Sequence, residues 1–302
     1  MTFMIDPGRL HVLRVVQHHG SVSEAARVMH LTPSAVSQQI RQLASDAGAA
    51  LLERDGRSIR LTPAAHRLLE YSHLVAAAWE QTRADLAALD SGAQVAGQLS
   101  LGSFATAIPA LVVPAASAIM ARQPGVTVAV RETSTADSLT LLLQRTIDLA
   151  VIAAPVDHPL DDPRFEQHTL VDDYQDLVVA ADGDVARRGA ERLLDVSRER
   201  WVEPHPDQRR LIEAACAMEG FVPHFEHRTD DWSSVLSLVA AGMGVCLYPR
   251  LAPINTAGVH RIALSGPNLP IRRVLTCVRT GSARQPLIHA FRSALTRGIE
   301  RR

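Results

Sequence analysis

The sequence predicts a multidomain protein with a small, mostly helical N-terminal domain, one long helix and a larger α/β domain. Three observations predict it. Short amphipathic helices and a hairpin signal fill residues 8–66. No strand signal appears from residue 63 to about residue 91, and beyond that point strand and helix signals alternate. At roughly 150 residues per domain, a chain of 302 residues has room for about two domains.

The stretch SVSEAARVMHLTPSAVSQQIRQL predicts two short helices joined by a tight turn. Ser21 and Glu24 have the spacing of a capping box, so a first helix is expected over residues 22–29. Thr32 is a favourable N-cap and Pro33 suits the first position of a helix, so a second helix should begin there.

The second helix separates apolar from polar side chains. Its inward face is predicted to carry Val36, Ile40 and Leu43. Another face is predicted to expose Ser34, Ser37, Gln38 and Arg41. An ordinary helical corner with a solvated face is the alternative, but such a face usually carries Glu and Lys. Because Ser, Gln and Arg bond base edges and phosphates, the pattern favours a helix-turn-helix.

The flanking segments add to this unit. Upstream, an amphipathic helix is expected to end at Gly20, and downstream Gly48 is expected to cap the second helix of the pair. The upstream helix buries Leu10, Leu13 and Val16. Next, LLERDGRSIRLTP has two short apolar-containing runs around Asp55-Gly56, a strong hairpin signal. This hairpin carries Arg54, Arg57 and Arg60. Together these elements predict a winged helix.

GSVSEAARVMHLTPSAVSQQIRQL followed by LLERDGRSIRLTPAA resembles the N-terminal domain of LysR-type transcriptional regulators, and the resemblance covers residues 8–66. Four positions depart from the usual family pattern: Ala44, Ala47, Leu52 and Ala65. The resemblance implies double-stranded DNA as a partner, with base- and phosphate-facing positions at Thr32, Pro33, Ser34, Ser37 and Gln38. It also matches Arg54 to the wing arginine, beside which Arg57 lies in the turn. A tetrameric assembly and contact with RNA polymerase are further implications of the resemblance.

Charge and composition place limits on how DNA is bound. The net charge of the chain is −1, and residues 1–66 carry seven arginines against five acids, which gives +2. DNA affinity must therefore depend on where the arginines lie and on having two copies of the domain. The chain has no lysine, so all 31 basic residues are arginine, which a GC-rich genome would also produce.

The sequence also predicts a cytoplasmic protein with no membrane partner. MTFMIDPGRLHVLRVV lacks the apolar core and cleavage site of a signal peptide. The longest apolar run, at residues 107–121, is shorter than the ~20 residues of a membrane span and holds two prolines. Cys216, Cys246 and Cys277 lie far apart without a CxxC pair, which fits reduced structural thiols.

A linker helix is predicted between the two domains. Apolar and small residues repeat at alternating steps of four and three, as in a coiled-coil seam. The seam consists of Leu68, Ser72, Val75, Trp79, Thr82, Leu86 and Leu89. Packing against its own domain is the alternative; a helix between domains has less of its own chain to lie against, so a homodimer is favoured. SGAQVAG at residues 91–97 is predicted to be the hinge.

The alternating signals beyond the hinge predict a parallel α/β arrangement. Strands are expected at residues 98–104, 126–132, 148–154, 176–181, 200–204, 224–229, 244–249, 259–264 and 272–279. Helices are expected over 108–122, 136–144, 208–219, 232–241 and 286–299. This region resembles the two-lobed, periplasmic-binding-protein-like effector domain of the same regulators. The expected domains are 1–62, 63–91 and 92–302, with lobe I at about 97–170 and 259–302 and lobe II at about 171–258.

A ligand site is predicted where strands end and helices begin, because open α/β sheets bind ligands there. Hydroxyls beside free N–H groups suit a carboxylate or similar anion, and the resemblance implies a small, often anionic metabolite as effector. The candidates from the first lobe are Ser103, Phe104, Thr106, Thr133 and Ser134. Those from the second lobe are His205, Thr229 and Tyr248. Helix capping is the alternative for Thr133, Ser134 and Thr229.

No catalytic or metal-binding constellation is predicted, and no cofactor is expected. The chain lacks GxGxxG, GxSxG, HExxH and P-loop motifs. His224 and His227 fall on opposite faces of a strand. The acidic pairs 161–162, 172–173 and 230–231 are expected in loops or at helix starts, as caps. Two other function classes are a binding protein of periplasmic type without a regulatory role and an architectural DNA protein. The DNA module disfavours the former and the two lobes disfavour the latter.

Overall fold

The computed structural model describes residues 5–55, 58–89, 95–154 and 161–300. The chain forms two compact units, Met1–Thr82 and Arg83–Arg302, with the division inside one long helix, α4 (Pro63–Leu89). Among the described residues, no helix is both long enough and apolar enough to cross a bilayer.

The first unit is a three-helix domain with a hairpin. Its elements are α1 (Pro7–His19), α2 (Val22–Val28), α3 (Pro33–Ala47), β1 (Leu52–Asp55) and β2 (Ser58–Leu61). Gly20 and Gly48 end α1 and α3 in the left-handed conformation, as expected for helix C-caps. The antiparallel pairing of β1 with β2 confirms the predicted hairpin. The winged helix-turn-helix is therefore present.

The first two residues of the predicted seam in α4 face the chain's own first unit and not a partner helix. Leu68 packs against the core of the first unit, and Ser72 is buried. The apolar side chains of the predicted seam that are exposed lie further along the helix: Trp79, Leu86 and Leu89. A seam open to a partner can therefore begin only after Ser72. The predicted hinge falls largely on residues 91–94, which lie outside the described residues.

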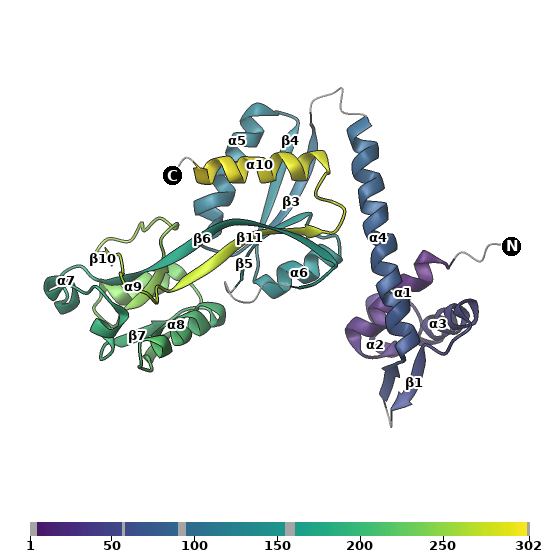
Figure 1. The fold of residues 1–302 in the computed structure, drawn as a ribbon, viewed down its shortest axis with the longest axis horizontal. Helices are drawn as coiled ribbons and strands as arrows, with labels where there is room; N and C mark the ends of the chain where they lie inside the picture. Colours follow the sequence, from purple (N-terminus) through teal and green to yellow (C-terminus); the bar gives the residue numbers. More distant parts are fainter. Residues whose placement is uncertain (1–4, 56–57, 90–94, 155–160, 301–302) are drawn as a thin grey trace. The chain divides into compact units, whose positions relative to one another are not determined.

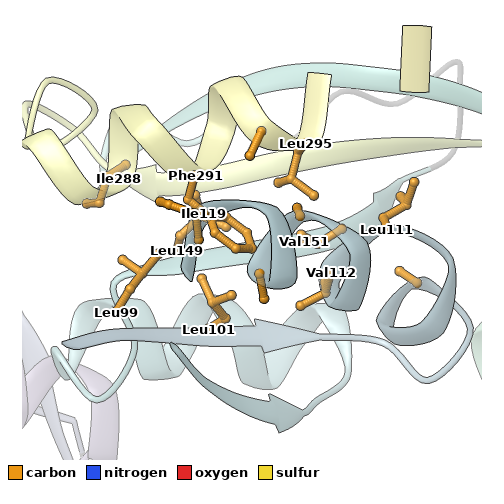
Figure 2. Packing of buried hydrophobic residues seen from close by; sticks show 14 of the residues in the cluster. Leu99, Leu101, Leu111, Val112, Ile119, Leu149, Val151, Ile288, Phe291 and Leu295 are labelled. Carbon is orange, nitrogen blue, oxygen red and sulfur yellow. The ribbon is translucent and has the colours of Figure 1, made fainter. Parts of the chain in front are cut away.

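The second unit contains two lobes (Figure 1). The first lobe has the parallel strands β3 (Gly97–Ser103), β4 (Val126–Glu132) and β5 (Leu149–Ala154). Its helices are η1 (Ile108–Val112), α5 (Val113–Arg122), α6 (Thr135–Leu143) and α10 (Pro286–Glu300). Figure 2 shows α10 packed over this lobe, with Phe291 and Leu295 meeting side chains of α5 and the sheet. The end of the chain therefore covers the first lobe.

The second lobe consists of shorter elements. They are α7 (Asp184–Arg188), η2 (Leu193–Val196), β7 (Arg200–Glu203), α8 (Pro206–Met218), β8 (His224–Arg228), α9 (Trp232–Ala240), β9 (Cys246–Pro249) and β10 (Val259–Ile262). One core packs α8 against Trp201 and Leu247, and another packs α9 against Val178 and Cys246. Apolar side chains thus pack in two clusters against the strands of this lobe, one with α8 and one with α9.

Two long strands join the lobes. β6 (Phe165–Ala180) pairs with β11 (Ile271–Arg279) over its first part and with β9 and β10 over its last. The sequence predicted a strand only over residues 176–181. The preceding residues, FEQHTLVDDYQ, are largely polar, and they form a strand because β11 supplies its hydrogen-bond partner. The expected lobe boundary at residues 170/171 therefore falls inside a continuous strand.

The place where the chain returns to the first lobe also differs. β10 pairs with residues 177–180 of β6, so residue 259 lies in the second lobe and the return comes with β11. The sequence pattern indicated a strand at this position but contained no information about its neighbour. The crossing point of the lobes is consequently built from β6, β11 and the residues that follow β9.

Candidate functional site

The two helices of the pair, α2 and α3, begin at the predicted N-caps, Ser21 and Thr32. The Ser21 hydroxyl accepts the Glu24 N–H at 3.0 Å, and the Thr32 hydroxyl accepts the Ala35 N–H at 3.2 Å. His30 adopts a φ of 54° in the turn, and the Leu31 N–H donates to the Ala26 carbonyl at 2.9 Å. These bonds fix the direction in which α3 leaves the turn.

Helix α3 divides into a buried and an exposed face, as predicted. Its buried side chains are Val36, Ile40 and Leu43. The facing residues of α2, Ala25 and Ala26, are also buried, and their small side chains let the two helices approach closely. Thr32, Pro33, Ser34, Gln38 and Arg41 are exposed, and Ser37 is half-buried. The structure therefore brings these predicted DNA-contacting residues onto one surface.

Gln38 and Arg41 are available to a ligand. In the part of the chain that the structure describes, neither side chain has a hydrogen-bond or ion-pair partner. Other arginines of this unit are engaged with carboxylates: Arg9 with Asp46, Arg27 with Glu24 and Arg60 with Glu53. Those pairs carry no net charge. The unpaired Arg41 on α3 therefore indicates where DNA binds better than the net charge of +2 over residues 1–66 does. Arg54 lies in β1, and Arg57 lies outside the described residues.

In the second unit, the predicted strand ends come together in pairs. The Thr133 N–H donates to the Ser103 carbonyl at 2.9 Å, so the ends of β4 and β3 lie side by side. The Thr229 N–H donates to the Glu203 carbonyl at 3.0 Å, which joins the ends of β8 and β7. Each lobe thus presents adjacent strand ends beside the helices that follow them.

Several of the predicted hydroxyls and rings act as caps. Ser134 accepts the Asp137 N–H at 3.1 Å, at the start of α6. His205 accepts the Asp207 N–H through Nδ1 at 3.3 Å, at the start of α8. Thr229 accepts the Asp231 N–H at 3.3 Å. Thr133 instead bonds the Ser138 hydroxyl at 2.7 Å. Ser134 and His205 are therefore the N-caps of α6 and α8.

Three predicted residues are buried. Ser103 is enclosed, and its hydroxyl donates to the neighbouring Phe104 carbonyl. Thr106 is buried and accepts a hydrogen bond from Arg272 Nη2 at 2.9 Å. The Tyr248 hydroxyl donates to the Pro253 carbonyl at 3.2 Å, and burial raises the pKa of this phenol. These side chains can contact a ligand only where the loop around them leaves an opening.

The sequence missed the pair at the centre of the crossing, Arg272 and Asp173. Nε and Nη2 of Arg272 donate to Asp173 Oδ2 at 3.1 and 2.8 Å, and the guanidinium lies 4.5 Å from the Phe104 ring centroid. Asp173 Oδ1 accepts the Leu251 N–H. Burial lowers the pKa of Arg272, while Asp173 opposes that shift. The pair connects the 103–106 loop of the first lobe to the segment after β9 in the second.

The prediction that residues 172–173 lie in a loop or at a helix start is wrong. Both aspartates lie inside β6, opposite Arg273 and Arg272 of β11. Two adjacent acids and two adjacent arginines on antiparallel strands make two cross-strand ion pairs. The DD and RR dipeptides are the signal in the sequence, but the separation of 99 positions between Asp173 and Arg272 conceals it.

The three cysteines are buried inside the second unit. Burial raises the pKa of Cys216, Cys246 and Cys277 to about 12 in each case. A thiol with so high a pKa is protonated at neutral pH and is a poor nucleophile. The cysteines therefore act as small core side chains.

A winged helix-turn-helix with a free polar face on α3, attached to a two-lobed α/β domain, defines a DNA-binding protein with a second domain of the ligand-binding type. Comparison with known families agrees. The family described as "Bacterial regulatory helix-turn-helix protein, lysR family" matches residues 7–66, and "LysR substrate binding domain" matches residues 92–299. The chain belongs to the LysR family of transcriptional regulators, and it is a DNA-binding regulator with a substrate-binding domain.

Individual relatives span almost the whole chain. The HTH-type transcriptional regulator CbbR of Rhodospirillum rubrum is 29% identical over 290 residues, 94% of this chain and 93% of its own. TfdS of Cupriavidus pinatubonensis is 28% identical over 286 residues, 92% and 94% of the two chains. Among solved structures, a full-length OxyR variant from Pseudomonas aeruginosa has a TM-score of 0.64 at 18% identity, covering 97% of this chain and 95% of its own. Full-length CbnR complexed with its target DNA has a TM-score of 0.57 at 21% identity, covering 97% and 99%.

Proposed function

We propose that this regulator reads its operator with α3 and senses a small anionic metabolite in the cleft between its two lobes. The observation that carries the DNA-reading role is the exposed face of α3, on which Gln38 and Arg41 lack partners among the described residues. Because CbnR, a structural relative, is complexed with its target DNA, the same mode of use is the natural proposal here. Such a protein would act in the cytoplasm, where the DNA is.

The proposed DNA contacts divide into two roles. Gln38 and Arg41 reach base edges in the major groove, since a glutamine amide matches adenine and a guanidinium matches guanine. Thr32, Ser34 and Ser37 lie nearer the start of α3, where hydroxyls and N–H groups suit phosphate oxygens. Arg54 belongs to β1, and Arg57 lies three positions further along the sequence. The proposed role of both arginines is contact with the minor groove or the DNA backbone.

Gln38→Ala is expected to lose discrimination at one base pair, at a cost of about 1–3 kcal/mol if the contact is bidentate. The measurement is fluorescence anisotropy with the DNA upstream of the protein's own gene, with variants of that site and with random DNA. Gln39→Ala is the matched control, because it removes the same amide one position along α3 and away from the proposed contact face.

Arg57→Ala is expected to weaken binding to all DNA sequences alike. It should also reduce the slope of log affinity against log salt concentration by about 1. The two variants therefore give different signatures. Equal weakening of specific and random DNA by Gln38→Ala would show that α3 does not read sequence.

The proposed effector site uses the paired strand ends and the crossing pair. Phe104, Thr106 and Thr133 come from the first lobe, and Arg272 contacts two of them. The Arg272–Asp173 pair carries no net charge, so the proposed attraction for a carboxylate or another small anion comes from charge-assisted hydrogen bonds of Arg272 Nη1, which has no partner among the described residues, and from the nearby hydroxyls. From the second lobe, His205, Thr229 and Tyr248 would complete the site, with Ser103 and Ser134 as its further candidates.

Thr133→Val is expected to abolish the transcriptional response to the effector while operator binding remains intact. A panel of small organic acids and amino acids, screened by thermal shift, would supply the effector for a reporter assay. Ser138→Ala is the control, because it breaks the same 2.7 Å hydrogen bond and leaves the Thr133 hydroxyl in place. Ser103→Leu is a less clean test, since the larger side chain would overfill an enclosed position.

A full response in Thr133→Val would remove this residue from the proposed site. Loss of the response in Ser138→Ala as well would show that loop structure, and not a ligand contact, carries the effect. For assembly, we propose a dimer through α4, a tetramer of two such dimers, and contact with RNA polymerase when bound to DNA.

A further inference from the structure

A hollow of about 560 Å³ lies at the crossing of the two lobes. Pro109 of η1 contributes to its wall from the first lobe, and the other lining residues come from the segment between β9 and β10 and from β10 itself. We call this hollow the hinge pocket. None of the effector-site residues predicted from the sequence lines it. Its size falls within the range of small-molecule sites.

Two arginines in the wall of the hinge pocket share one carboxylate. Arg250 donates through Nε and Nη2 to Asp176 Oδ1 at 2.9 and 2.7 Å, and Arg261 Nη1 lies 3.5 Å from Asp176 Oδ2. Asp176 is only 2% exposed. Two guanidiniums against one carboxylate leave a net charge of +1 at the pocket wall, which favours an anion.

The two guanidiniums are held in place before any ligand arrives. Arg261 donates to the Arg250 carbonyl at 2.8 Å and to the Ala252 carbonyl at 2.6 Å. The Arg250 guanidinium lies 5.3 Å from the Tyr174 ring centroid, and that of Arg261 lies 5.4 Å from the Tyr248 ring centroid. Fixed donors bind with a smaller loss of side-chain entropy than flexible ones.

Some donors of this pair remain available. Within the described ranges, Arg250 Nη1 and Arg261 Nε have no hydrogen-bond partner. Most other lining residues have apolar side chains, among them Leu251, Pro253, Ile254 and Val259 beside Pro109, with Thr256 as the polar exception. A ligand that satisfies both features carries a carboxylate at one end and a short hydrocarbon body at the other.

We propose that the hinge pocket binds a small amphipathic carboxylate and is a second anion site, separate from the effector site at the strand ends. This goes beyond the proposed function. Both lobes supply its wall, and the neighbouring Leu251 N–H is bonded to Asp173 of the crossing pair at 3.2 Å. A bound carboxylate therefore contacts the segment that sets the position of one lobe against the other.

The test measures binding of hexanoate to the full-length protein by isothermal titration calorimetry. Hexanol and hexylamine are the matched probes, because they keep the hydrocarbon body and remove or invert the charge. The expected result is saturable binding of hexanoate with no binding of the other two. Absence of hexanoate binding, or equal binding of hexanol, would overturn the proposal.

Two variants locate the site. Arg261→Gln is expected to weaken hexanoate binding roughly tenfold or more, since a charged hydrogen-bonding group is lost. Ile254→Glu is expected to abolish binding by placing a negative charge in the wall, and it leaves all contacts of Asp176 untouched. Arg210→Gln is the control, because this exposed arginine pairs with Asp207 outside the pocket.

Wild-type affinity in Ile254→Glu, or equal weakening in Arg210→Gln, would overturn the assignment. Thr133→Val separates this proposal from the effector site: hexanoate affinity should be unchanged in that variant even though the effector response is lost. If hexanoate binding fell in Thr133→Val and persisted in Ile254→Glu, the carboxylate would be bound at the strand ends and the hinge pocket would not be a site.

Discussion

Asp173→Ala is expected to lower the free energy of unfolding of the second unit by about 3–5 kcal/mol. Asp173 is 1% exposed and the Arg272 side chain 11%. Truncating the aspartate leaves a buried guanidinium that keeps Thr106 as a hydrogen-bond partner and loses its charge partner. It also frees the Leu251 N–H. An uncompensated buried charge is among the most destabilising changes that one substitution can make.

The adjacent ion pair provides an internal control. Asp172 and Arg273 are about one-third exposed, so Asp172→Ala should cost at most about 1 kcal/mol. Urea unfolding followed by circular dichroism would measure both variants. Replacing the whole pair, Asp173→Ala with Arg272→Met, should recover much of the loss, because no buried charge remains. Equal destabilisation by Asp172→Ala and Asp173→Ala would show that burial does not determine the strength of the crossing pair.

The first unit could be predicted almost residue by residue because its signals are local. Ser21 and Glu24, and likewise Thr32 and Pro33, lie within one helical turn of each other, and the structure has the N-caps Ser21 and Thr32. The returning half of the predicted capping box is absent, because the Glu24 carboxylate pairs with Arg27. Burial of Val36, Ile40 and Leu43 follows the same short-range periodicity. What could not be predicted is which arginines are already paired, because Arg9 meets Asp46 only after the helices pack together.

The crossing between the lobes could not be predicted in the same way. The first part of β6 lacks the apolar alternation of a strand, and its pairing with β11 joins segments about a hundred residues apart in the chain. A single sequence shows which residues are acidic or basic but not which of them become opposite partners. The sequence accordingly predicts the acidic pair 172–173 in a loop or at a helix start, and it gives no sign of the hinge pocket, which depends on that crossing.

The linker helix could be predicted in part: its extent follows from the local sequence, but its contacts do not. Its length and helicity follow from local sequence, and the structure gives one helix over Pro63–Leu89. The seam was predicted from heptad spacing alone, which does not distinguish a partner helix from the helix's own domain. In the structure Leu68 is half-buried against the core of the first unit, and Ser72 is buried. Only the positions after Ser72, from Val75 to Leu89, remain as candidates for contact with a second copy.

Leu86→Asp is therefore expected to convert the proposed dimer into a monomer and to weaken operator binding roughly 10²–10⁴-fold. Trp79 and Leu86 are each 54% exposed and Leu89 is 83% exposed in the single chain, at the spacing of a helical seam. Burying each such side chain in a dimer contributes about 1.5–3 kcal/mol, whereas an aspartate at that position would be buried without a partner. In the proposed dimer two DNA-binding units engage one operator together, so loss of the dimer would remove the gain in affinity from their linkage.

Sedimentation velocity would measure the oligomeric state of the Leu86→Asp variant, and anisotropy would measure its operator binding. Ala87→Asp is the matched control: it adds the same charge one residue along α4, on an exposed position turned away from the seam, and should leave both readouts near wild type. Retained helical circular dichroism would confirm that the DNA-binding unit is still folded. An unchanged sedimentation coefficient in Leu86→Asp would mean that α4 does not form the dimer contact. Equal loss in both variants would show that the added charge acts on the helix itself, because only a seam contact distinguishes position 86 from position 87.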